Sequence, residues 1–477
     1  MKLTDLLAAS GLGLSAPDNP VITGITADSR AVKPGYLFAA LPGVKADGAQ
    51  YIEAAKAAGA AAILGTTQAA TVQSENPRLA LAKLATAFYG PLPQNIVAVT
   101  GTNGKTSTAN FAMQLFNATG HKAAAIGTIG ITGPGVERDG SLTTPDPIAL
   151  AQDLGRLKAQ GFDHVALEAS SHGIDQYRLD GLTLKAAGFT YLGRDHLDYH
   201  GTLEGYFKAE AQLFERLLPA GGTAVLNADC AEYAQLASIA RARGQSLISY
   251  GPSGSDLRLV KSIPMPTGLG LTINAFGEQV DTILKVTGNF QAGNVLCALG
   301  LVIGAGVPVK KALAHLSDLA NVRGRLELVG QTPDGAGVYV DYAHTPDALE
   351  TVLHALRAHT SGRLISLFGC GGNRDKGKRP QMGAISARLA DVTYVTDDNP
   401  RLEEAAQIRS EILNAAPHAI EVDDRAKAIQ MAVKTLKPGD TLVIAGKGHE
   451  QGQIVGTEVR PFDDAAIARA ALKELKA

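Results

Sequence analysis

Residues 96–106 read Ile-Val-Ala-Val-Thr-Gly-Thr-Asn-Gly-Lys-Thr, a pattern typical of a strand that passes through a tight turn into a helix. The first residues are β-branched and apolar, and Phe111 and Phe116 continue the pattern at helical spacing. A glycine-rich turn at a helix N-terminus presents backbone N–H groups to phosphate oxygens. In such a loop Lys105 would reach the terminal phosphates of a nucleotide, and Thr106 a magnesium ion.

This loop departs from the strict G-x-x-x-x-G-K-[ST] pattern, because only two residues separate Gly101 from Gly104. The alternative is an ordinary glycine-rich turn without a ligand. We favour a phosphate loop, since the lysine and the threonine both stand where the binding of phosphate and magnesium requires them.

Composition limits the classes of protein. The chain has 477 residues, enough for about three domains, and 45% of them are hydrophobic. A net charge of -2 gives no basic footprint for nucleic acid. Cys230, Cys297 and Cys370 lie far apart and predict free thiols in a reducing compartment. We therefore expect a cytoplasmic, monomeric protein, with no membrane span because no stretch reaches about 18 apolar residues.

The pattern of elements predicts an α/β fold. Residues 1–93 form a first small α/β domain that ends near a Pro-Leu-Pro linker, 94–321 form the phosphate-loop domain, and 322–477 restart the α/β rhythm. Strands are expected in the last two domains at residues 96–100, 123–127, 164–167, 184–192, 325–329, 337–342, 364–368, 392–396, 420–422 and 441–444. Helices are expected from 106 and at 148–160, 206–218, 289–303 and 308–319, with a β-hairpin flap at 256–288.

Polar residues gather where the predicted strands of the second domain end. Glu168 ends one strand, Thr143 and Thr144 precede a helix, and a histidine-rich stretch at 194–200 follows another strand. Each has an ordinary alternative, since a glutamate can cap a helix and a histidine-rich loop can be plain surface. Ligands collect at the carboxyl ends of parallel strands, so together these residues predict a magnesium–phosphate site.

Four loops of the third domain are dense in Arg, Lys, Asp and His, at residues 341–347, 369–379, 397–401 and 446–450. They suggest a face that binds a zwitterionic ligand and a nucleotide; the alternative is a solvated charged rim. Gly-Cys-Gly-Gly at 369–372 does not match G-x-G-x-x-G, so a dinucleotide fingerprint is not supported.

These motifs, in this order, resemble the Mur ligase family over essentially the whole chain. Besides the phosphate loop they are Glu-Ala-Ser-Ser-His at 168–172, Arg-Asp-His-Leu-Asp-Tyr-His-Gly at 194–201, Gly-Arg at 324–325, Asp-Tyr-Ala-His-Thr-Pro-Asp at 341–347 and Gly-Lys-Gly-His-Glu at 446–450. The resemblance implies a UDP-binding N-terminal domain, a central ATPase domain and a C-terminal Rossmann-like domain.

The resemblance also implies a reaction that belongs to peptidoglycan precursor synthesis, and so to cell-wall growth, shape and division. ATP would phosphorylate the D-glutamate side-chain carboxylate of UDP-N-acetylmuramoyl-L-alanyl-D-glutamate. The amine of meso-diaminopimelate would then attack the acyl phosphate. A carboxylate is a poor electrophile and the reacting groups are anionic, so activation by ATP and shielding by Mg²⁺ fit the cationic residues present.

Site residues follow from the same resemblance, motif by motif. The ATP site would comprise Gly101, Thr102, Asn103, Gly104, Lys105, Thr106, Asn294, Arg325 and Asp341, with Asn294 on adenine, Arg325 on phosphate and Asp341 on ribose. Ser29, Asp47 and Gly48 would line the uridine site, and Thr143, Thr144, Ser170, Gln176 and Arg178 would hold the muramoyl-dipeptide. Magnesium ligands would be Thr106, Glu168, His196 and Glu210, the last three being catalytic together with Lys105. The meso-diaminopimelate pocket would comprise Arg379, Asp398, Asn399, Pro400, Arg401, Gly446 and Glu450.

Selectivity for meso-diaminopimelate has a physical basis in this set. Arg401 can clamp the distal carboxylate bidentately, while Glu450 and Asp398 can take the distal ammonium. Lysine lacks that carboxylate, and leaving Arg401 unpaired in a closed site would cost on the order of several kcal/mol.

Two positions depart from the family. Asn373 stands where the Gly-Cys-Gly-Gly loop usually continues with Asp, and Glu210 stands where a carbamylated lysine is expected. Lys208 is two residues away and projects from another helix face. We interpret Glu210 as a permanent anion that makes activity independent of dissolved carbon dioxide. The alternative is a solvent-facing glutamate and a lost second metal site.

Two other functions stay open at this point. A non-catalytic binding subunit would use the fold only to hold a nucleotide or precursor, and Glu210 is the feature that favours it. A folate-type or other Mur ligase is disfavoured by the Asp-Asn-Pro-Arg loop at 398–401.

Overall fold

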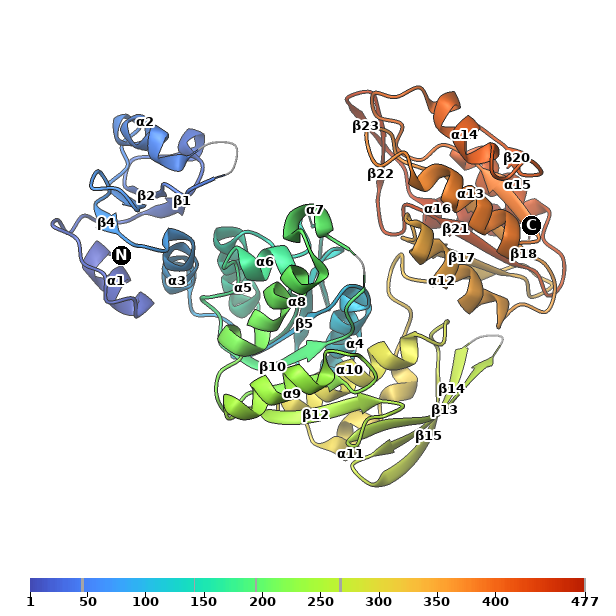
Figure 1. Cartoon of the computed structure of the whole chain (residues 1–477), viewed down its shortest axis with the longest axis horizontal. Helices are drawn as coiled ribbons and strands as arrows, with labels where there is room; N and C mark the ends of the chain where they lie inside the picture. Colours follow the sequence, from blue (N-terminus) through green and yellow to red (C-terminus); the bar gives the residue numbers. More distant parts are fainter. Residues whose placement is uncertain (44–46, 141, 194, 266–267, 476–477) are drawn as a thin grey trace. The chain divides into compact units, whose positions relative to one another are not determined.

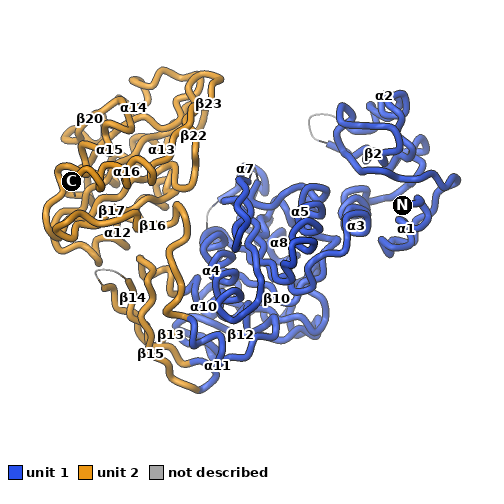
Figure 2. Tube along the Cα trace, turned by 180° about the vertical axis from the view of Figure 1, so that it is seen from behind, with its two compact units in different colours: residues 1–258, 275–277, 293–315 blue, residues 259–274, 278–292, 316–477 orange. Residues whose placement is uncertain are grey.

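The computed structural model describes residues 1–43, 47–140, 142–193, 195–265 and 268–475, and Figure 1 shows its elements along the chain. The chain divides into two compact units (Figure 2). Unit 1 comprises residues 1–258, 275–277 and 293–315, and unit 2 comprises residues 259–274, 278–292 and 316–477. Each unit is described by itself.

The N-terminal part of unit 1 is a small parallel sheet with the order β1-β2-β3-β4. Its strands are β1 (Gly24–Thr26), β2 (Tyr36–Ala39), β3 (Ala62–Gly65) and β4 (Val72–Gln73), and its helices are α1 (Leu3–Ser10), α2 (Ile52–Ala57) and α3 (Pro77–Tyr89). Asn76 caps α3 by accepting the N–H of Leu79, and Pro77 occupies the first turn, where no intrahelical N–H is needed. Apolar side chains of α1, α3 and the sheet form one buried cluster.

The central part of unit 1 is a larger sheet. Its strand order is β12-β11-β10-β5-β9-β6-β7-β8, parallel from β12 to β6 and antiparallel at β7 and β8. The strands are β5 (Asn95–Thr100), β6 (Ala123–Gly127), β7 (Gly130–Gly133), β8 (Val136–Arg138), β9 (His164–Glu168), β10 (Leu184–Phe189), β11 (Thr223–Asn227) and β12 (Ser246–Gly251). The helices are α4 (Lys105–Ala118), α5 (Pro147–Ala159), α6 (Ser171–Asp175), α7 (Leu197–His200), α8 (Leu203–Gln212), α9 (Tyr233–Ala242), α10 (Gln291–Gly304) and α11 (Val309–Leu313).

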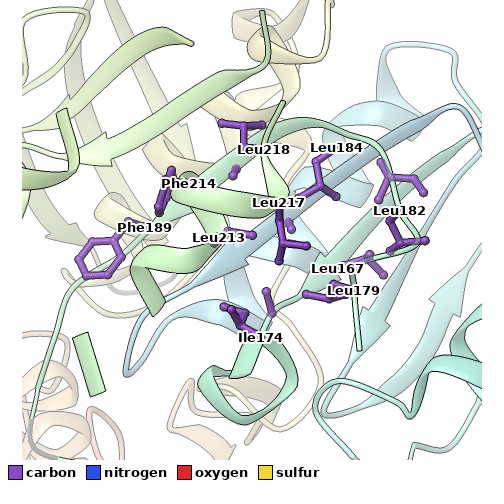
Figure 3. Packing of buried hydrophobic residues seen from close by; sticks show 14 of the residues in the cluster. Leu167, Ile174, Leu179, Leu182, Leu184, Phe189, Leu213, Phe214, Leu217 and Leu218 are labelled. Atoms are coloured by element: carbon purple, nitrogen blue, oxygen red, sulfur yellow. The ribbon is translucent and has the colours of Figure 1, made fainter. Parts of the chain in front are cut away.

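A hydrophobic core packs together the elements that carry the predicted site residues. Figure 3 shows side chains of β9, α6, β10 and the turn after α8 gathered in one cluster: Leu167, Ile174, Leu179, Leu182, Leu184, Phe189, Leu213, Phe214, Leu217 and Leu218. Because β5, β9 and β10 are nearly continuous apolar runs with helices packed on them, their carboxyl ends are the natural place for polar groups.

Unit 2 contains most of a three-stranded flap, the C-terminal sheet and a hairpin. Most of β13 (Leu257–Met265) and β14 (Gly268–Ala275), with β15 (Glu278–Leu284), form the flap, in the order β13-β14-β15. The C-terminal sheet has the order β16-β17-β21-β18-β19-β20, with only β16 antiparallel to its neighbour. Its strands are β16 (Glu327–Gln331), β17 (Gly337–Asp341), β18 (Leu364–Phe368), β19 (Val392–Val395), β20 (Ile420–Glu421) and β21 (Thr441–Ala445), followed by the hairpin β22 (Gly452–Val455) and β23 (Glu458–Pro461).

Helices cover both faces of the C-terminal sheet. They are α12 (Pro346–Arg357), α13 (Lys378–Leu389), α14 (Ala405–Leu413), α15 (Arg425–Lys434) and α16 (Asp464–Glu474). Along β21, Val443 packs with the residues of α12, α13 and α14, whereas Leu442 and Ile444 pack with α15 and α16. This alternation is the period of a β-strand and explains two hydrophobic clusters in one doubly wound domain.

The predicted α/β class with parallel sheets is confirmed, and so is the flap at 256–288. The helix predicted at 206–218 is present, as α8 continued without a break by a π-helical turn (Leu213–Leu217). The helix predicted at 308–319 was too long: α11 ends at Leu313, and a short 3-10 turn (Leu316–Asp318) follows. Hydrophobic period alone does not separate these helix types, which differ only in the hydrogen-bond step.

Candidate active site

The phosphate loop lies between β5 and α4, as its sequence predicts. Gly101 and Gly104 both have positive φ, and a Cβ at Gly104 would collide with the side-chain oxygen of Asn294. Only glycine adopts this backbone here without strain. The ammonium of Lys105 lies over the loop and donates to the carbonyl oxygens of Gly101 (2.5 Å) and Thr102 (3.0 Å). Asn294, for which an adenine contact was predicted, therefore stands against the phosphate loop.

Glu210 is fully buried on α8, so the alternative of a solvent-facing residue is wrong. Its Oε1 accepts hydrogen bonds from Thr100 Oγ1 and from the N–H of Gly101, both at 3.2 Å. Its Oε2 is buried without a hydrogen-bond partner. Burial raises the pKa of the Glu210 carboxyl to about 7, against the opposing effect of the Lys105 ammonium. The carboxylate thus sits at the base of the phosphate loop.

Lys208 cannot substitute at this position. Its side chain is 70% exposed and pairs with Glu204 one turn earlier on α8. The prediction that it projects from a different helix face than Glu210 is confirmed.

Glu168 ends β9 and is the polar centre of the sheet edge. Its Oε2 accepts from Thr106 Oγ1 (2.9 Å) and Thr128 Oγ1 (3.1 Å), and its Oε1 accepts from the N–H of Thr128 (2.8 Å). Thr128 Oγ1 lies 3.0 Å from Thr143 Oγ1. Glu168 therefore joins the phosphate loop to the predicted acceptor residues, with Thr128 as a link that sequence reasoning missed.

The predicted acceptor residues of the central part form a second network next to Glu168. Thr144 Oγ1 donates to the carbonyl oxygen of Glu168 and accepts the N–H of Ser170. Arg178 donates to the carbonyl oxygen of Thr144 (2.6 Å) and to Gln176 Oε1 (2.8 Å). These four residues are thus brought together by α6 and the loop after it.

Gln176 and Arg178 also line a cavity of about 690 Å³ within unit 1. Its walls come from the N-terminal sheet and α3 on one side and from the start of α5 on the other. They include Thr26, Asp28, Lys33, Tyr36, Arg78, Asp146 and Gln152. Lys33 and Arg78 were missed from the sequence, because nothing in the local pattern distinguishes a cavity lysine or arginine from a surface one.

The uridine residues predicted from the resemblance lie in two capped turns. Ser29 opens the 3-10 turn Ser29–Ala31, where Asp28 accepts the N–H of Arg30 and pairs with its exposed guanidinium at 2.8 Å. Asp47 caps the turn Gly48–Tyr51 by accepting the N–H of Ala49. Asp28 and Arg30 thus form a surface ion pair on either side of Ser29.

His196 belongs to a cluster of rings. His196 has a positive φ, and its ring centroid lies 4.9 Å from that of His172 and 5.8 Å from that of Tyr206. Tyr206 lies one turn before Glu210 on α8. Burial, followed by the charges of His196 and His200, lowers the pKa of His172. Tyr206 connects His196 to the helix that carries Glu210.

In unit 2, Asp341 and Arg325 lie at the carboxyl end of β17. The carboxylate of Asp341 is buried and accepts the N–H groups of Leu326 and Ala343, each at 2.7 Å. Burial raises the pKa of Asp341, opposed by Arg325. The Arg325 guanidinium lies 4.7 Å from the ring centroid of Tyr342. A flat cationic and aromatic surface therefore stands beside a fixed carboxylate.

The predicted amino-acid pocket gathers at the carboxyl ends of β19 and β21. Asn399 Nδ2 donates to Glu450 Oε2 at 3.1 Å, and Arg401 Nη1 donates to the carbonyl oxygens of Gly372 (2.9 Å) and Asn399 (3.4 Å). Gly446 has a positive φ and approaches the Asp398 carboxylate so closely that a Cβ would touch it. Pro400 completes the buried floor of this loop.

Arg379 lies apart from the open side of these loops. Its side chain is fully buried and pairs with Glu403 (3.0 Å) and Glu411 (2.8 Å). Contact with a ligand would require these pairs to open, so the proposed role of Arg379 narrows to holding the loop at 371–379. Arg374 in the same loop is exposed.

Two of the four predicted metal ligands, Thr106 and Glu168, fit a magnesium ion that brings other ligands with it. Within the described ranges no three His, Cys, Asp or Glu side chains converge as a ready-made metal cage. Magnesium usually takes one or two protein oxygens together with water and substrate phosphates. Thr106 and Glu168, hard oxygen donors 2.9 Å apart next to the phosphate loop, match that requirement.

Three family models match the chain: the "Mur ligase family, catalytic domain" at residues 21–94, the "Mur ligase middle domain" at 99–302, and the "Mur ligase, glutamate ligase domain" at 324–448. The chain belongs to the Mur ligase family.

Its relatives include proteins named UDP-N-acetylmuramoyl-L-alanyl-D-glutamate--2,6-diaminopimelate ligase. The one from Caulobacter vibrioides is 52% identical over 96% of this chain and 97% of its own, and the one from Agrobacterium fabrum is 50% identical over 95% and 94%. A solved structure with the same name has a TM-score of 0.72 and 31% identity, covering 96% of each chain.

A helix able to cross a membrane would have to be longer and more apolar than any helix in the described ranges.

Proposed function

We propose that this protein is an ATP-dependent, ADP-forming ligase that adds meso-2,6-diaminopimelate to UDP-N-acetylmuramoyl-L-alanyl-D-glutamate in peptidoglycan precursor synthesis. The observation that carries the proposal is the 52% identity over nearly the full length of a relative that bears this name. Two contacts at the predicted phosphate loop support it: Lys105 lies over the loop and donates to its carbonyl oxygens, and Thr106 donates to Glu168. A cytoplasmic location is part of the proposal and rests on the free thiols.

The first chemical step uses the phosphate loop. The D-glutamate side-chain oxygen attacks the γ-phosphorus of ATP, the bond to the bridging oxygen breaks, and ADP leaves. Lys105 must then leave the carbonyl oxygens of Gly101 and Thr102 and turn its charge toward the transferring phosphoryl group. Magnesium, held by Thr106 and Glu168 and the nucleotide, would neutralise charge on the phosphate oxygens.

In the second step the amine of meso-diaminopimelate attacks the acyl carbon. The tetrahedral intermediate expels inorganic phosphate and leaves an amide, and the amine loses a proton. Arg401 would hold the distal carboxylate, and Glu450 with Asp398 the distal ammonium. Arg401 already donates to two carbonyl oxygens of its own loop, so it is held near the pocket before a ligand arrives.

The cavity in unit 1 suits the nucleotide acceptor. Its volume of about 690 Å³ lies within the range of pockets that bind small molecules and cofactors. Lys33, Arg78 and Arg178 supply positive charge for a diphosphate, and Tyr36 supplies a ring for stacking. The reacting glutamate would extend from there past Ser170 and Thr144 toward Glu168.

Glu210 would supply, once ionised, the anion that a carbamylated lysine would otherwise provide; with a pKa of about 7, its carboxyl loses its proton near that pH. Its side chain is about three bonds shorter, or on the order of 3–4 Å along an extended chain. Its Oε1 binds the phosphate loop directly. A water molecule would have to bridge from its Oε2 to a metal, which magnesium tolerates.

A phosphate-release assay tests the function. The protein is incubated with ATP, Mg²⁺ and the nucleotide dipeptide, and meso-diaminopimelate, L-lysine or no amino acid is added. We expect phosphate release and a nucleotide tripeptide only with meso-diaminopimelate. Release with L-lysine at equal efficiency would contradict the assignment of the amino acid, and nucleotide binding without any release would indicate a non-catalytic binding protein.

A further inference from the structure

Lys447 is a fully buried lysine in the loop that follows β21. Removing an ammonium group from water is costly unless its protons are all used. The Nζ atom donates to Asn399 Oδ1 (2.9 Å) and to the carbonyl oxygen of Gly452 (2.7 Å), and it lies 3.5 Å from Glu450 Oε2. An ammonium has three N–H donors, and three acceptors surround this one.

These acceptors come from two stretches of the chain: the loop after β19, and the continuous stretch from the end of β21 to the start of β22, which contains Lys447 itself. Asn399 lies in the loop after β19, Glu450 in the loop after β21, and Gly452 begins the hairpin strand β22. One buried charge therefore ties together the loops that carry the predicted amino-acid pocket. Since Lys447 has no exposed surface, it acts through these loops and not by touching a ligand.

The orientation of the Asn399 amide depends on Lys447. Its Oδ1 accepts from Lys447 and also from the N–H of Ile454 (2.9 Å), so the Nδ2 group must face Glu450. A flipped amide would turn its NH₂ group toward Lys447 Nζ and the N–H of Ile454, which are both donors. The backbone carbonyl oxygen of Asn399 in turn accepts from Arg401, so the network reaches both Arg401 and Glu450.

We propose that Lys447 is a positioning residue for the amino-acid substrate, which sets Asn399 and Glu450 in the arrangement that receives its distal ammonium end. This rests on the proposed function. Lys447 should consequently govern the affinity for the amino acid far more than the affinity for ATP or the nucleotide acceptor.

The test is steady-state kinetics of Lys447→Met in the full chain. Methionine keeps an unbranched apolar stem in a side chain one heavy atom shorter than that of lysine, and leaves the oxygens of Asn399 and Gly452 without this donor. We expect the KM for meso-diaminopimelate to rise roughly 10- to 100-fold, the size of effect seen for residues that orient the side chains bound to a metal ion. The KM values for ATP and for the nucleotide dipeptide should stay close to those of the unmodified protein.

Val443→Ala is the matched control. Val443 is buried in the middle of β21, where it packs in an apolar cluster with side chains of α12, α13 and α14. Its truncation should lower the melting temperature and leave the KM for meso-diaminopimelate unchanged. Lys447→Met with a lowered melting temperature and an unchanged KM would show a merely structural lysine and overturn the proposal.

Two further variants keep the outcome interpretable. If Lys447→Met does not fold, Lys447→Arg replaces it; arginine keeps the charge, and its different geometry should raise the same KM by a smaller factor. In a double-mutant cycle, Asn399→Ala should cost less in the Lys447→Met background than in the unmodified protein, and additive effects would contradict the network. If the unmodified protein uses another amino acid, the proposed function is wrong, and the effect of Lys447 is read on the KM for that amino acid. Failure to turn over any amino acid would overturn both.

Discussion

At the scale of single residues, the phosphate loop combines one mobile charge with one fixed charge. Lys105 is on a flexible stem and now binds its own loop, whereas Glu210 is locked beneath it by Thr100 and Gly101. The two residues contact the same loop in different ways. Their substitutions should therefore have different effects on turnover and on magnesium dependence.

Lys105→Ala should abolish useful ligation. The ammonium is the group closest to the transferring phosphoryl group in the proposed reaction, and loss of one such contact costs on the order of 10²–10³ in kcat. The measurement is phosphate release at saturating ATP, with Lys208→Ala as a control, since Lys208 is exposed on α8. Near-normal turnover by Lys105→Ala would refute the assignment of the loop.

Glu210 should make the enzyme independent of bicarbonate. The carboxylate is part of the side chain and needs no modification, so activity in bicarbonate-depleted buffer should equal that in ordinary buffer. Glu210→Ala should lower turnover and alter its dependence on magnesium concentration. A requirement for bicarbonate would contradict the interpretation that Glu210 replaces the carbamylated lysine. A Glu210→Ala variant with unchanged turnover and magnesium dependence would contradict it as well.

The buried Glu210 carboxyl also predicts a pH dependence of stability. A pKa of 4.5 in the unfolded chain and about 7 in the fold means that the native state keeps a proton which the unfolded state loses, at a cost of roughly 3 kcal/mol. Stability should fall as pH rises from about 4.5 to 7. Glu210→Gln should remove this dependence. The free energy of unfolding of the variant should therefore exceed that of the unmodified protein by more at pH 8 than at pH 5, as measured by denaturant unfolding. Parallel pH profiles of both proteins would argue against it.

At the scale of elements, specificity belongs to loops that join strands to helices. The loop after β19 carries Asp398, Asn399 and Arg401, and the loop after β21 carries Gly446 and Glu450. Both strands lie in the interior of the C-terminal sheet, so their carboxyl ends hold the loops at a set spacing.

Arg401→Ala should impair use of meso-diaminopimelate far more than binding of the nucleotide acceptor. Removal of a bidentate charged partner typically costs on the order of 2–3 kcal/mol, or about 30- to 160-fold in kcat/KM for the amino acid. Titration calorimetry with the nucleotide dipeptide is the companion measurement. If the affinity for the dipeptide collapsed while that for the amino acid stayed intact, the pocket would be misplaced.

At the scale of the whole molecule, each unit has its own hydrophobic cores, so unfolding need not be two-state. Unit 2 also contains a fully buried ion pair between Arg425 on α15 and Asp464 on α16, with two N–O distances of 2.7 Å. Breaking such a pair leaves an uncompensated charge in the core.

Asp464→Ala should lower the stability of unit 2 alone by about 3–5 kcal/mol. Scanning calorimetry should show one transition shifted and the other unchanged. Arg460→Ala is the control, because the Arg460–Glu458 pair at 3.0 Å is exposed and should be worth less than about 1 kcal/mol. A shift of both transitions, or an equal effect of the control, would contradict the prediction.

Much of the fold could be predicted because local signals agree with it. The strand, the two glycines and Lys105 with Thr106 lie within residues 96–106, and their chemistry follows from backbone geometry over a few residues. The polar residues at strand ends could also be predicted, because the carboxyl ends of parallel strands share an edge. The helix predicted at 308–319, which ends at Leu313, shows the limit of hydrophobic period.

The sequence by itself determined the α/β class, the phosphate loop and the residue types of the site. Only the tertiary structure decided that Glu210 is buried against Gly101, that Lys33 and Arg78 line a cavity, and that Lys447 rather than solvent holds Asn399. The physical reason is that burial and the choice of hydrogen-bond partner depend on segments far apart in the chain. No local pattern tells a buried charge from an exposed one.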